Sequence, residues 1–335
     1  MGSRGRRIGP AEVALARAIE SIDESVSLPG GTTWEPKWDG YRLLADRRGD
    51  GVTLWSRRGT DLTRAFPDVA GAVAEQLPPG VLVDGEVVVW ADGRLDFSAL
   101  QRRVASLRTA ARQAAERPAS YVAFDLLVAG TDDLRGWPLR QRRAVLEELA
   151  AHWRPPMTLS PATDDIDIAR GWFRDLAVAG VEGLVAKGAA QPYPAGRRDW
   201  LKIKQRSVLD VVCAAVIGPI GQPAAVVAGL PIDGELRIVG RTVPLTALAS
   251  RTLAREIRPA VSDHPWPEVV TSAAVSGFGG GGDPVRLTRI EPVVVEVSAD
   301  VAWSGRSFRH PLRFVRARID VDPAEVDVDP VLRRS

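Results

Sequence analysis

The sequence predicts an α+β protein of two domains, in which a first domain of antiparallel sheets with flanking helices is followed by a small β-barrel. Three observations predict this fold class. The 335 residues suffice for two ordinary domains. Up to about Ser207, strand-like and helix-like segments are interspersed. After Ser207, short β-rich runs follow one another between glycine and proline turns. We therefore assign residues 1–206 to the first domain and residues 207–335 to the second.

The first domain is predicted to contain both helices and strands. Apolar residues at helical spacing indicate helices over residues 10–21, 66–76, 97–116, 139–152 and 164–179. β-Branched and apolar runs indicate strands over residues 41–47, 51–57, 81–90, 121–128, 183–188 and 199–204. Turn signals indicate hairpins at residues 48–51 and 91–97. The arginine-rich face of segment 97–116 fits either a solvated surface or one that contacts phosphates.

The second domain is predicted to be a small barrel of the oligonucleotide-binding kind, because short strands surround one inserted helix. The strands are expected over residues 208–218, 224–230, 235–243 and 292–298. The helix is expected near Leu245–Ile257, and the glycine-rich stretch 276–284 predicts a flexible loop. Residues 320–329 alternate acidic residues with valine and proline, which indicates an acidic tail or a cover for the barrel.

The composition excludes several classes of protein. The formal net charge is only +2, so anion binding has to come from local groups of charge. One cysteine, Cys213, excludes an internal disulfide framework and suits a buried thiol in a reducing cytosol. No stretch approaches the roughly 20 apolar residues that span a membrane, and the basic start lacks the apolar core of a secretory signal. We therefore expect a cytoplasmic protein without a membrane partner.

Lysine is rare among the basic residues. Of 44 basic side chains only four are lysine, namely Lys37, Lys187, Lys202 and Lys204, and the rest are arginine. Arginine keeps its proton in proteins, whereas a desolvated lysine amine can become a nucleophile. A GC-rich genome would also favour arginine. However, three of the four lysines fall in segments that look like nucleotide-site motifs, and the fourth follows the run EGLVA.

The segment EPKWDGYR, residues 35–42, suits a covalent nucleophile. Lys37 and Asp39 would face one side of an extended strand, so that the carboxylate can orient the amine. Gly40 lets the backbone turn tightly beside a phosphate, and Arg42 adds a fixed cation for a sugar or a 5′-phosphate. The segment resembles the Lys-x-Asp-Gly-x-Arg motif of the covalent nucleotidyltransferase superfamily of ligases and capping enzymes. An exposed turn with charge pairs is the alternative.

Later segments resemble the next motifs of that superfamily, in the same order. They are SRRG at 56–59, DGE at 84–86 and AFDLL at 123–127. The resemblance implies that Arg57 holds a phosphate and that Glu86 lies near the ribose and a metal ion, with Asp84 in support. It also implies that the ring of Phe124 stacks on the base. Taken alone, Phe124 would be a core residue of an apolar strand.

Two further segments, EGLVAK at 182–187 and DWLKIK at 199–204, resemble the motifs that follow. The resemblance implies that Glu182 is a second metal ligand and that Lys187 contacts the nucleotide. Lys202 and Lys204 are two residues apart, so one face of a strand presents both amines to the AMP phosphates. Glu35, two residues before Lys37, is expected to contact the nucleotide as well.

The segment RHPLRFVRARID, residues 309–320, resembles the motif on the barrel domain of the superfamily. The resemblance implies that Arg316 and Arg318 orient the triphosphate leaving group. The family often has a lysine after the aspartate that corresponds to Asp320, but Val321 stands there in this chain. Five arginines between Arg306 and Arg318 would also suit a DNA backbone groove.

The resemblance covers residues 25–320. In detail, the sequence is similar to the short stand-alone bacterial ATP-dependent DNA ligases of the ligase C type. It implies a nucleotidyltransferase (ATP-grasp-like) adenylation domain over residues 1–206, then an OB-fold domain with an acidic tail. It also implies ATP as cofactor, AMP carried on Lys37, and Mg²⁺ on Glu86 and Glu182, with Mn²⁺ able to substitute. The site then has to lower the pKa of Lys37, through Lys202, Lys204 and the metal ion.

The implied partner is nicked double-stranded DNA, and the protein is expected to act as a monomer in the bacterial cytosol near the nucleoid. It would work in DNA repair with separate repair proteins. An RNA ligase or a GTP-dependent capping enzyme is the nearest alternative. A NAD-dependent ligase fits less well, since such chains carry an extra amino-terminal domain and cysteine-rich zinc modules. A non-catalytic nucleic-acid-binding module is the alternative from a different class.

Overall fold

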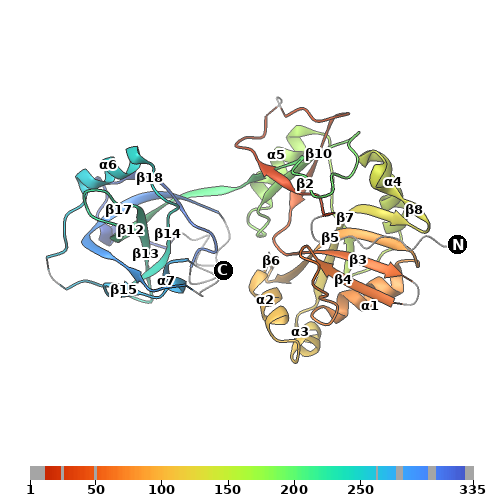
Figure 1. Ribbon diagram of the computed structural model, residues 1–335, viewed down its shortest axis with the longest axis horizontal. Helices are drawn as coiled ribbons and strands as arrows, with labels where there is room; N and C mark the ends of the chain where they lie inside the picture. The colour runs from red at the N-terminus through yellow and green to blue at the C-terminus, as the bar shows by residue number, and fades with distance from the viewer. Residues whose placement is uncertain are drawn as a thin grey trace. The chain divides into compact units, whose positions relative to one another are not determined.

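The computed structural model describes residues 12–23, 26–48, 51–261, 263–276, 282–300 and 307–328. The chain divides into two compact units, Met1–Lys204 and Gln205–Ser335. Each unit has its own sheets, as Figure 1 shows, and its own apolar core. No helix in the described part of the chain is long and apolar enough to cross a membrane.

Two sheets form the frame of the first unit. The larger has the strand order β4-β3-β5-β7-β8, with β6 paired to β5 and β9 to β7. Its strands are β3 (Tyr41–Arg48), β4 (Gly51–Ser56), β5 (Val81–Ala91), β6 (Arg94–Leu95), β7 (Ala119–Ala129), β8 (Asp132–Asp133) and β9 (Met157–Leu159). The smaller has the order β1-β11-β10-β2, built from β1 (Ala16–Ala18), β2 (Thr32–Lys37), β10 (Gly183–Gly188) and β11 (Trp200–Lys204). Only the pairs β1–β11 and β7–β9 of these sheets are parallel.

Helices cover the outer faces of both sheets. They are α1 (Pro67–Gln76), α2 (Phe97–Ala105), α3 (Ala110–Glu116), α4 (Leu139–Ala150) and α5 (Ile166–Asp175). Helix α1 packs on β3, β4 and β7, α2 packs on β5, and α5 packs on β2 and β10 of the smaller sheet. Figure 1 accordingly shows α1 and α5 on opposite sides of the paired sheets.

Strand β3 shows why the two sheets stack. Its side chains alternate between two apolar clusters, as a strand that is buried on both faces requires. Leu43 and Ala45 join the cluster beneath α1, whereas Leu44 joins a second cluster with Leu82 and Trp200. Trp200 belongs to the smaller sheet, so this second cluster is an apolar layer between the sheets.

The second unit is built on a five-stranded antiparallel sheet with the order β14-β13-β12-β17-β18. Its strands are β12 (Arg206–Ile217), β13 (Ala225–Ile232), β14 (Glu235–Arg241), β17 (Thr288–Asp300) and β18 (Arg313–Ala317). A parallel bridge between Thr242 and Leu312 joins the two outer ends of the sheet. Helix α6 (Ala247–Glu256) lies between β14 and β17 in the chain, together with β15 (Val269–Val270), α7 (Ser272–Ser276) and β16 (Val285–Arg286).

Cys213 lies in the core of the second unit, as predicted. It is fully buried, and burial raises its pKa to about 12, so the thiol stays protonated and unreactive. The pairing of β12 with β17 shifts register between Cys213 and Ala215. An irregularity of this kind bends a strand and lets a sheet curve. At the other end of the unit, Val326 is buried in the same core, so the described part of the acidic segment covers the sheet.

Two predicted elements are corrected. The helix expected over residues 10–21 is wrong for the described residues from 12 onward, where β1 pairs with β11 and Ala14 forms a bridge to Ala195. Val13 and Ala14 bury their side chains between the sheets, so this pairing overrides the helical spacing. The helix expected over 97–116 is two helices with a break at residues 106–109. Residues 49–50 of the predicted turn and residues 277–281 of the predicted loop lie outside the described residues.

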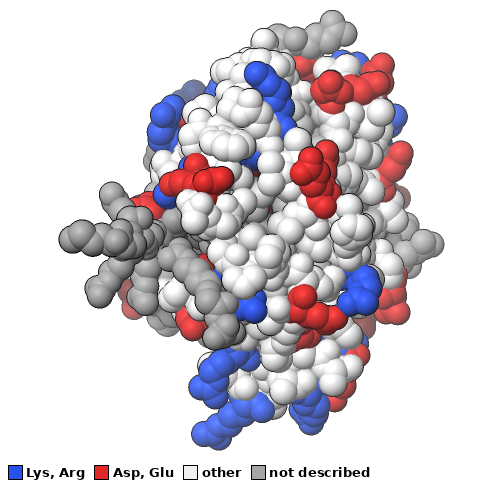
Figure 2. Space-filling view, turned by 90° about the vertical axis from the view of Figure 1, so that its right-hand side faces the viewer, with Lys and Arg blue, Asp and Glu red and all other residues white. Residues whose placement is uncertain are grey.

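The arginines of α2 and α3 do not form one uniform face. Arg103 is 1% exposed and donates to both carboxylate oxygens of Asp68, at 3.0 and 2.9 Å, and to the backbone carbonyl of Arg117. Arg102 and Arg117 are exposed instead, and both pair with Asp96. Figure 2 shows basic side chains gathered at the lower end of this unit, the level at which Figure 1 places α3. Arg103 therefore ties α1 to α2 and α3, and its neighbours face solvent.

We expect Arg103→Ala to lower the free energy of unfolding by about 3–5 kcal/mol, because Asp68 would lose its buried partner. Arg102→Ala is the matched control and should change it by no more than about 0.5 kcal/mol. Urea unfolding of the full chain, followed by tryptophan fluorescence, measures both. Equal midpoints for the two variants would show that Arg103 does not hold the helices together.

Candidate active site

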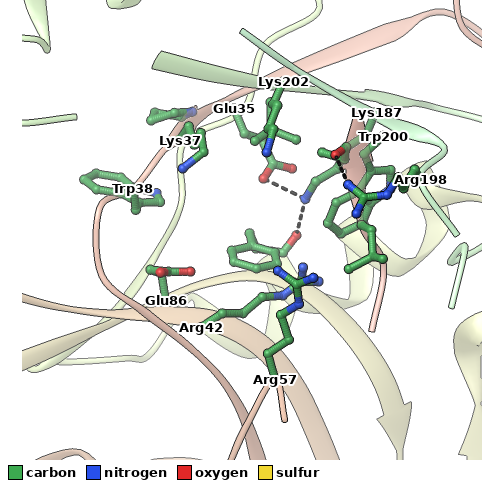
Figure 3. A pocket seen from close by; sticks show the side chains of 15 residues that line it. Glu35, Lys37, Trp38, Arg42, Arg57, Glu86, Lys187, Arg198, Trp200 and Lys202 are labelled. Atoms are coloured by element: carbon green, nitrogen blue, oxygen red, sulfur yellow. Dashed lines mark hydrogen bonds and ion pairs between the residues drawn. The ribbon is translucent and has the colours of Figure 1, made fainter. Parts of the chain in front are cut away.

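A pocket of about 230 Å³ lies between the two sheets of the first unit. The smaller sheet contributes side chains from β1, β2, β10 and β11, and the larger sheet contributes side chains from β3, β5 and β7. Figure 3 shows the labelled side chains converging on the cavity from both sheets. The predicted site residues that line it are Glu35, Lys37, Arg42, Arg57, Glu86, Phe124, Lys187 and Lys202.

Lys37 is the last residue of β2, and its amine donates a hydrogen bond to Glu182. The pairing of β2 with β10 brings the two side chains together, because Lys37 lies opposite Gly183 and the N–H of Glu182 donates to the carbonyl of Lys37 at 2.9 Å. Lys204 of β11 is also opposite Gly183 and lies 3.5 Å from the same carboxylate. Glu182 is buried, so it is shared between two amines in a poorly solvated place.

The charges around Lys37 correct one prediction. Burial lowers the pKa of Lys37, but Glu182, Glu86 and Asp39 together outweigh burial and raise the pKa above its ordinary value. The protein side chains alone therefore do not lower the pKa of Lys37 as predicted. The amine with a lowered pKa is Lys202, first through burial and then through repulsion by Lys37 and Lys204.

Asp39 and Glu86 complete the acidic surroundings of Lys37. Strand β2 ends at Lys37, so the extended geometry expected for Lys37 and Asp39 does not reach Asp39. The field of Asp39 nevertheless acts on both Lys37 and Glu86. Glu86 lines the pocket, and burial raises its pKa to about 8, with Lys37 and Arg42 opposing that rise. A buried carboxylate with a raised pKa is a ready acceptor for a cation.

Glu35 and Lys187 form a buried ion pair at the other end of the pocket. Lys187 is 1% exposed, and its amine donates to Glu35 at 2.7 Å and to the backbone carbonyl of Phe124 at 3.2 Å. Burial raises the pKa of Glu35, while Lys187 opposes that rise. The second carboxylate oxygen of Glu35, Oε1, is buried and has no hydrogen-bond partner in the described part of the chain. Such a group calls for a donor from a ligand or from water.

Aromatic rings flank this ion pair. The ring of Phe124 is half-buried and meets the buried ring of Trp200 edge to face, with 6.2 Å between centroids. The amine of Lys187 lies 4.6 Å from the Phe124 centroid and 4.4 Å from the Trp200 centroid. Phe124 thus packs against the apolar layer and also lines the pocket, and its stacking on a base stays a prediction.

Arg42 is held by protein groups. Its guanidinium makes two hydrogen bonds to Asp84, at 2.9 and 2.6 Å, and a third to the hydroxyl of Tyr193 at 3.2 Å. Burial opposes its charge, but Asp84 keeps the pKa of Arg42 above its ordinary value. Asp84 therefore supports Arg42 directly. Arg57, by contrast, is exposed and has no hydrogen-bond or ion-pair partner among the described residues, so it is available to an anion in the pocket.

Two glycines let the strands of the site approach closely. A Cβ at Gly40 would overlap the backbone carbonyl of Val87, so the glycine allows close packing on β5, and its turn beside a phosphate stays a prediction. Gly183 has φ +147°, and a Cβ there would overlap the carbonyl of Ile203. Glycine at position 183 therefore lets β10 lie close to β11, where Lys204 is opposite Gly183.

Arg316 and Arg318, the predicted residues of the second unit, are engaged in ion pairs there. Arg316 pairs with Glu296 at 3.1 Å. Arg318 pairs with Asp210 at 3.0 Å and with Asp320 at 2.9 Å, and these carboxylates raise its pKa, with the hydrogen bond to Asp320 as the largest cause. Val321 packs against the apolar core of this unit, which gives a physical reason for an apolar residue at that position.

Several polar and aromatic residues of the site were not singled out from the sequence. Trp38, Arg198 and Trp200 line the pocket, and Tyr193 accepts a hydrogen bond from Arg42 and donates one to Asp84. Trp38 and Trp200 lie inside two of the recognised motifs and Arg198 directly precedes one, which is the signal that could have found them. Tyr193 lies in the run QPYPAG, where only the folded chain reveals its contact with β3 and β5.

A pocket that gathers amines, free cations, buried carboxylates and flat rings between two sheets is typical of an enzyme that handles a nucleotide. The family described as ATP dependent DNA ligase domain matches residues 13–204, more than half of the chain. The protein therefore belongs to the ATP-dependent DNA ligase family.

Individual relatives agree with this assignment. The chain is 35% identical to DNA ligase C2 of Mycolicibacterium smegmatis, over 93% of this chain and 92% of that protein. It is 35% identical to DNA ligase C of Mycobacterium tuberculosis, over 94% and 91% of the two chains. Among solved structures, the ligase domain of M. tuberculosis LigD is 26% identical with a TM-score of 0.50, covering 96% of this chain and 99% of that one. The family, the recognised resemblance to ligase C and the mixed α+β fold of the first unit are thus confirmed.

We expect Phe124→Ala to raise the dissociation constant for ATP about ten-fold or more, because stacking on an aromatic ring contributes about 1–3 kcal/mol per base. Isothermal titration with the intact chain measures the affinity. A thermal melt of the same variant is the control, and it should show one folded state. Gross unfolding with unchanged affinity in the folded fraction would instead show that Phe124 serves only the apolar layer.

Proposed function

We propose that the protein seals nicks in double-stranded DNA by joining a 5′-phosphate to a 3′-hydroxyl, with Lys37 as the covalent nucleophile. The observation that carries this proposal is the position of Lys37 in the pocket. Its amine lies among carboxylates that can orient it, and it lines the same pocket as exposed Arg57, Phe124 and Glu35. Membership of the ligase family and the names of the relatives support the same reaction.

Glu35 supports adenine as the base. Its buried Oε1 is an acceptor without a partner, and adenine offers an amino group at C6, where guanine has a carbonyl oxygen. If the purine that stacks on Phe124 is adenine, its amino group would donate to Glu35. If it is guanine, its carbonyl oxygen would face the carboxylate, and two acceptors would oppose each other. The pocket thus favours ATP over the GTP that a capping enzyme uses.

Three transfers follow from this arrangement. The Nζ of Lys37 loses a proton to water and forms a bond to the α-phosphorus of ATP, and pyrophosphate leaves with the electron pair of the broken bond. The 5′-phosphate of the nick then displaces the lysine, whose nitrogen takes up a proton again, and takes the AMP. Finally the 3′-hydroxyl loses its proton to water as its oxygen bonds to the 5′-phosphorus, and AMP leaves with the electron pair of the broken bond. Arg57 and Lys202 provide positive charge for the phosphate oxygens in each transfer.

The residues of the pocket fit Mg²⁺. Among the described residues no three His, Cys, Asp or Glu side chains are grouped closely enough to bind a metal ion. Mg²⁺ commonly uses one or two carboxylates and takes its other ligands from phosphates and water. Glu86, a buried carboxylate with a raised pKa, and Glu182 would hold it. When bound, the ion neutralises negative charge on these carboxylates and on the phosphates, and it thereby removes the influence that raises the pKa of Lys37.

The second unit is proposed to be an OB-fold domain that follows an adenylation domain. Its strand order, the parallel bridge from Thr242 to Leu312 and the position of α6 between β14 and β17 support this assignment. Arg316 and Arg318 would orient the pyrophosphate leaving group, as in the motif that they resemble. Because both arginines have carboxylate partners, they would have to exchange those partners for phosphate.

With DNA as its substrate, the protein is proposed to act as a monomer in the cytosol at the nucleoid. The proposed process is DNA repair. An RNA ligase remains the second candidate function, since the pocket geometry concerns the nucleotide and the phosphate but not the sugar of the strand.

We expect the intact protein to become labelled by α-³²P-labelled ATP in the presence of Mg²⁺. Lys37→Ala should abolish this labelling. Lys37→Arg is the sharper control, because it keeps the charge and the partner Glu182 but cannot release a proton. Neither variant should seal a nicked duplex, and parallel assays with RNA strands, GTP and NAD test the rival reactions. Adenylation of either variant would remove Lys37 from the role of nucleophile.

We expect Glu35→Gln to narrow the preference for ATP over inosine triphosphate about ten-fold, because a glutamine amide can donate to the carbonyl at C6. Protein labelling with each nucleotide gives the ratio. Glu182→Gln is the control, since it should impair labelling by both nucleotides alike. A ratio that is unchanged in Glu35→Gln would show that Glu35 does not read the base.

A further inference from the structure

Trp38, which follows Lys37 in the chain, and Trp90, which contacts Trp38, have no part in the steps described so far. Trp38 lines the pocket, and its indole N–H donates to the hydroxyl of Ser160 at 3.0 Å. Trp90 meets Trp38 edge to face, with 6.4 Å between centroids and 78° between planes. Trp90 is 42% exposed, which is a large apolar area to leave in water. Trp38 is thus held in one orientation, and Trp90 extends the aromatic surface outward.

The position of Trp90 links the pocket to the basic end of the unit. It follows Glu86 by four residues on β5, so both side chains project from the same face of the strand. Trp90 pairs with Leu95 of β6, and the next residue, Asp96, caps α2. Asp96 also pairs with exposed Arg102 and Arg117. Aromatic surface beside exposed arginines is the combination that contacts the bases and phosphates of a nucleic-acid strand.

The two tryptophans lie away from the base of the nucleotide cofactor. That base belongs with Phe124, Trp200 and Glu35, at the far end of the pocket. Figure 3 shows Trp38 on the opposite side of Lys37 from Trp200. In the last transfer, the attacking 3′-oxygen has to approach the phosphorus from the side opposite the departing AMP. A group that aligns the attacking strand therefore has to lie across Lys37 from the adenine.

We propose that Trp38 and Trp90 form a platform for the nucleotide that carries the 3′-hydroxyl at the nick. The platform positions the sugar of this nucleotide so that its 3′-hydroxyl loses a proton to water and its oxygen bonds to the activated 5′-phosphorus, while AMP leaves with the electron pair of the broken bond. Both tryptophans are positioning residues, since neither takes part in bond making. The inference rests on the proposed nick-sealing function and adds the site of the acceptor strand to it.

The test separates the first transfer from the last. Trp90→Ala, Trp90→Phe and wild type are compared in self-adenylation with labelled ATP, and in sealing of a pre-adenylated nick without ATP. We expect Trp90→Ala to self-adenylate like wild type and to seal the pre-adenylated nick about ten- to a hundred-fold more slowly. Trp90→Phe should recover most of the lost rate, because it keeps an aromatic face.

Trp137→Ala is the matched control. Trp137 is 40% exposed, close to the 42% of Trp90, and it shortly precedes α4, a helix that Figure 1 shows away from β6 and α2. Its loss should leave both reactions unchanged. If Trp90→Ala slowed self-adenylation and sealing equally, the pair would serve the nucleotide or the fold, and the platform would be refuted. If Trp90→Ala sealed at the wild-type rate, it would be refuted as well. Failure of wild type to adenylate or to seal would instead overturn the proposed function itself.

Discussion

The antiparallel pairing of β2 with β10 is the constraint on which the site depends. In this register Gly183 lies opposite Lys37 and Val185 lies opposite Glu35. This one pairing thereby places two ion pairs, Lys37 with Glu182 and Glu35 with Lys187. In the first pair β2 provides the lysine, and in the second it provides the glutamate. A slip of one residue would turn each of these side chains to the other face of its strand. The apolar layer against the larger sheet fixes the register, since Trp200 and Val185 of the smaller sheet pack there.

The sequence allowed most of the pocket to be predicted, because its residues occur in short motifs that keep their order along the chain. Eight predicted residues line one cavity although they come from segments far apart. The failures have physical causes. The spacing of Val13 and its neighbours suggested a helix, but backbone pairing with β11 decided the structure. Partners such as Tyr193, and the burial of Arg103 beside exposed Arg102, depend on contacts between distant segments that no local pattern encodes.

The charged groups of the pocket are arranged to receive a nucleotide. Glu182, Glu86 and Asp39 lie around Lys37, and together they hold the amine in its charged form. At the end of the pocket where we place the adenine, the buried Oε1 of Glu35 has no donor among the described residues. A nucleotide with its counter-ion would supply that donor and offset the carboxylates around Lys37.

Strand β1 carries a practical consequence. Leu15 and Ala16 form one wall of the pocket, and the carbonyl of Ala14 accepts a hydrogen bond from Arg42. The strand is attached to the sheet edge by pairing with β11 alone. An expression variant trimmed to begin just before β2 would keep every motif residue and still lose this wall. Trimming for crystallisation or immobilisation should therefore leave residues from about 12 onward untouched.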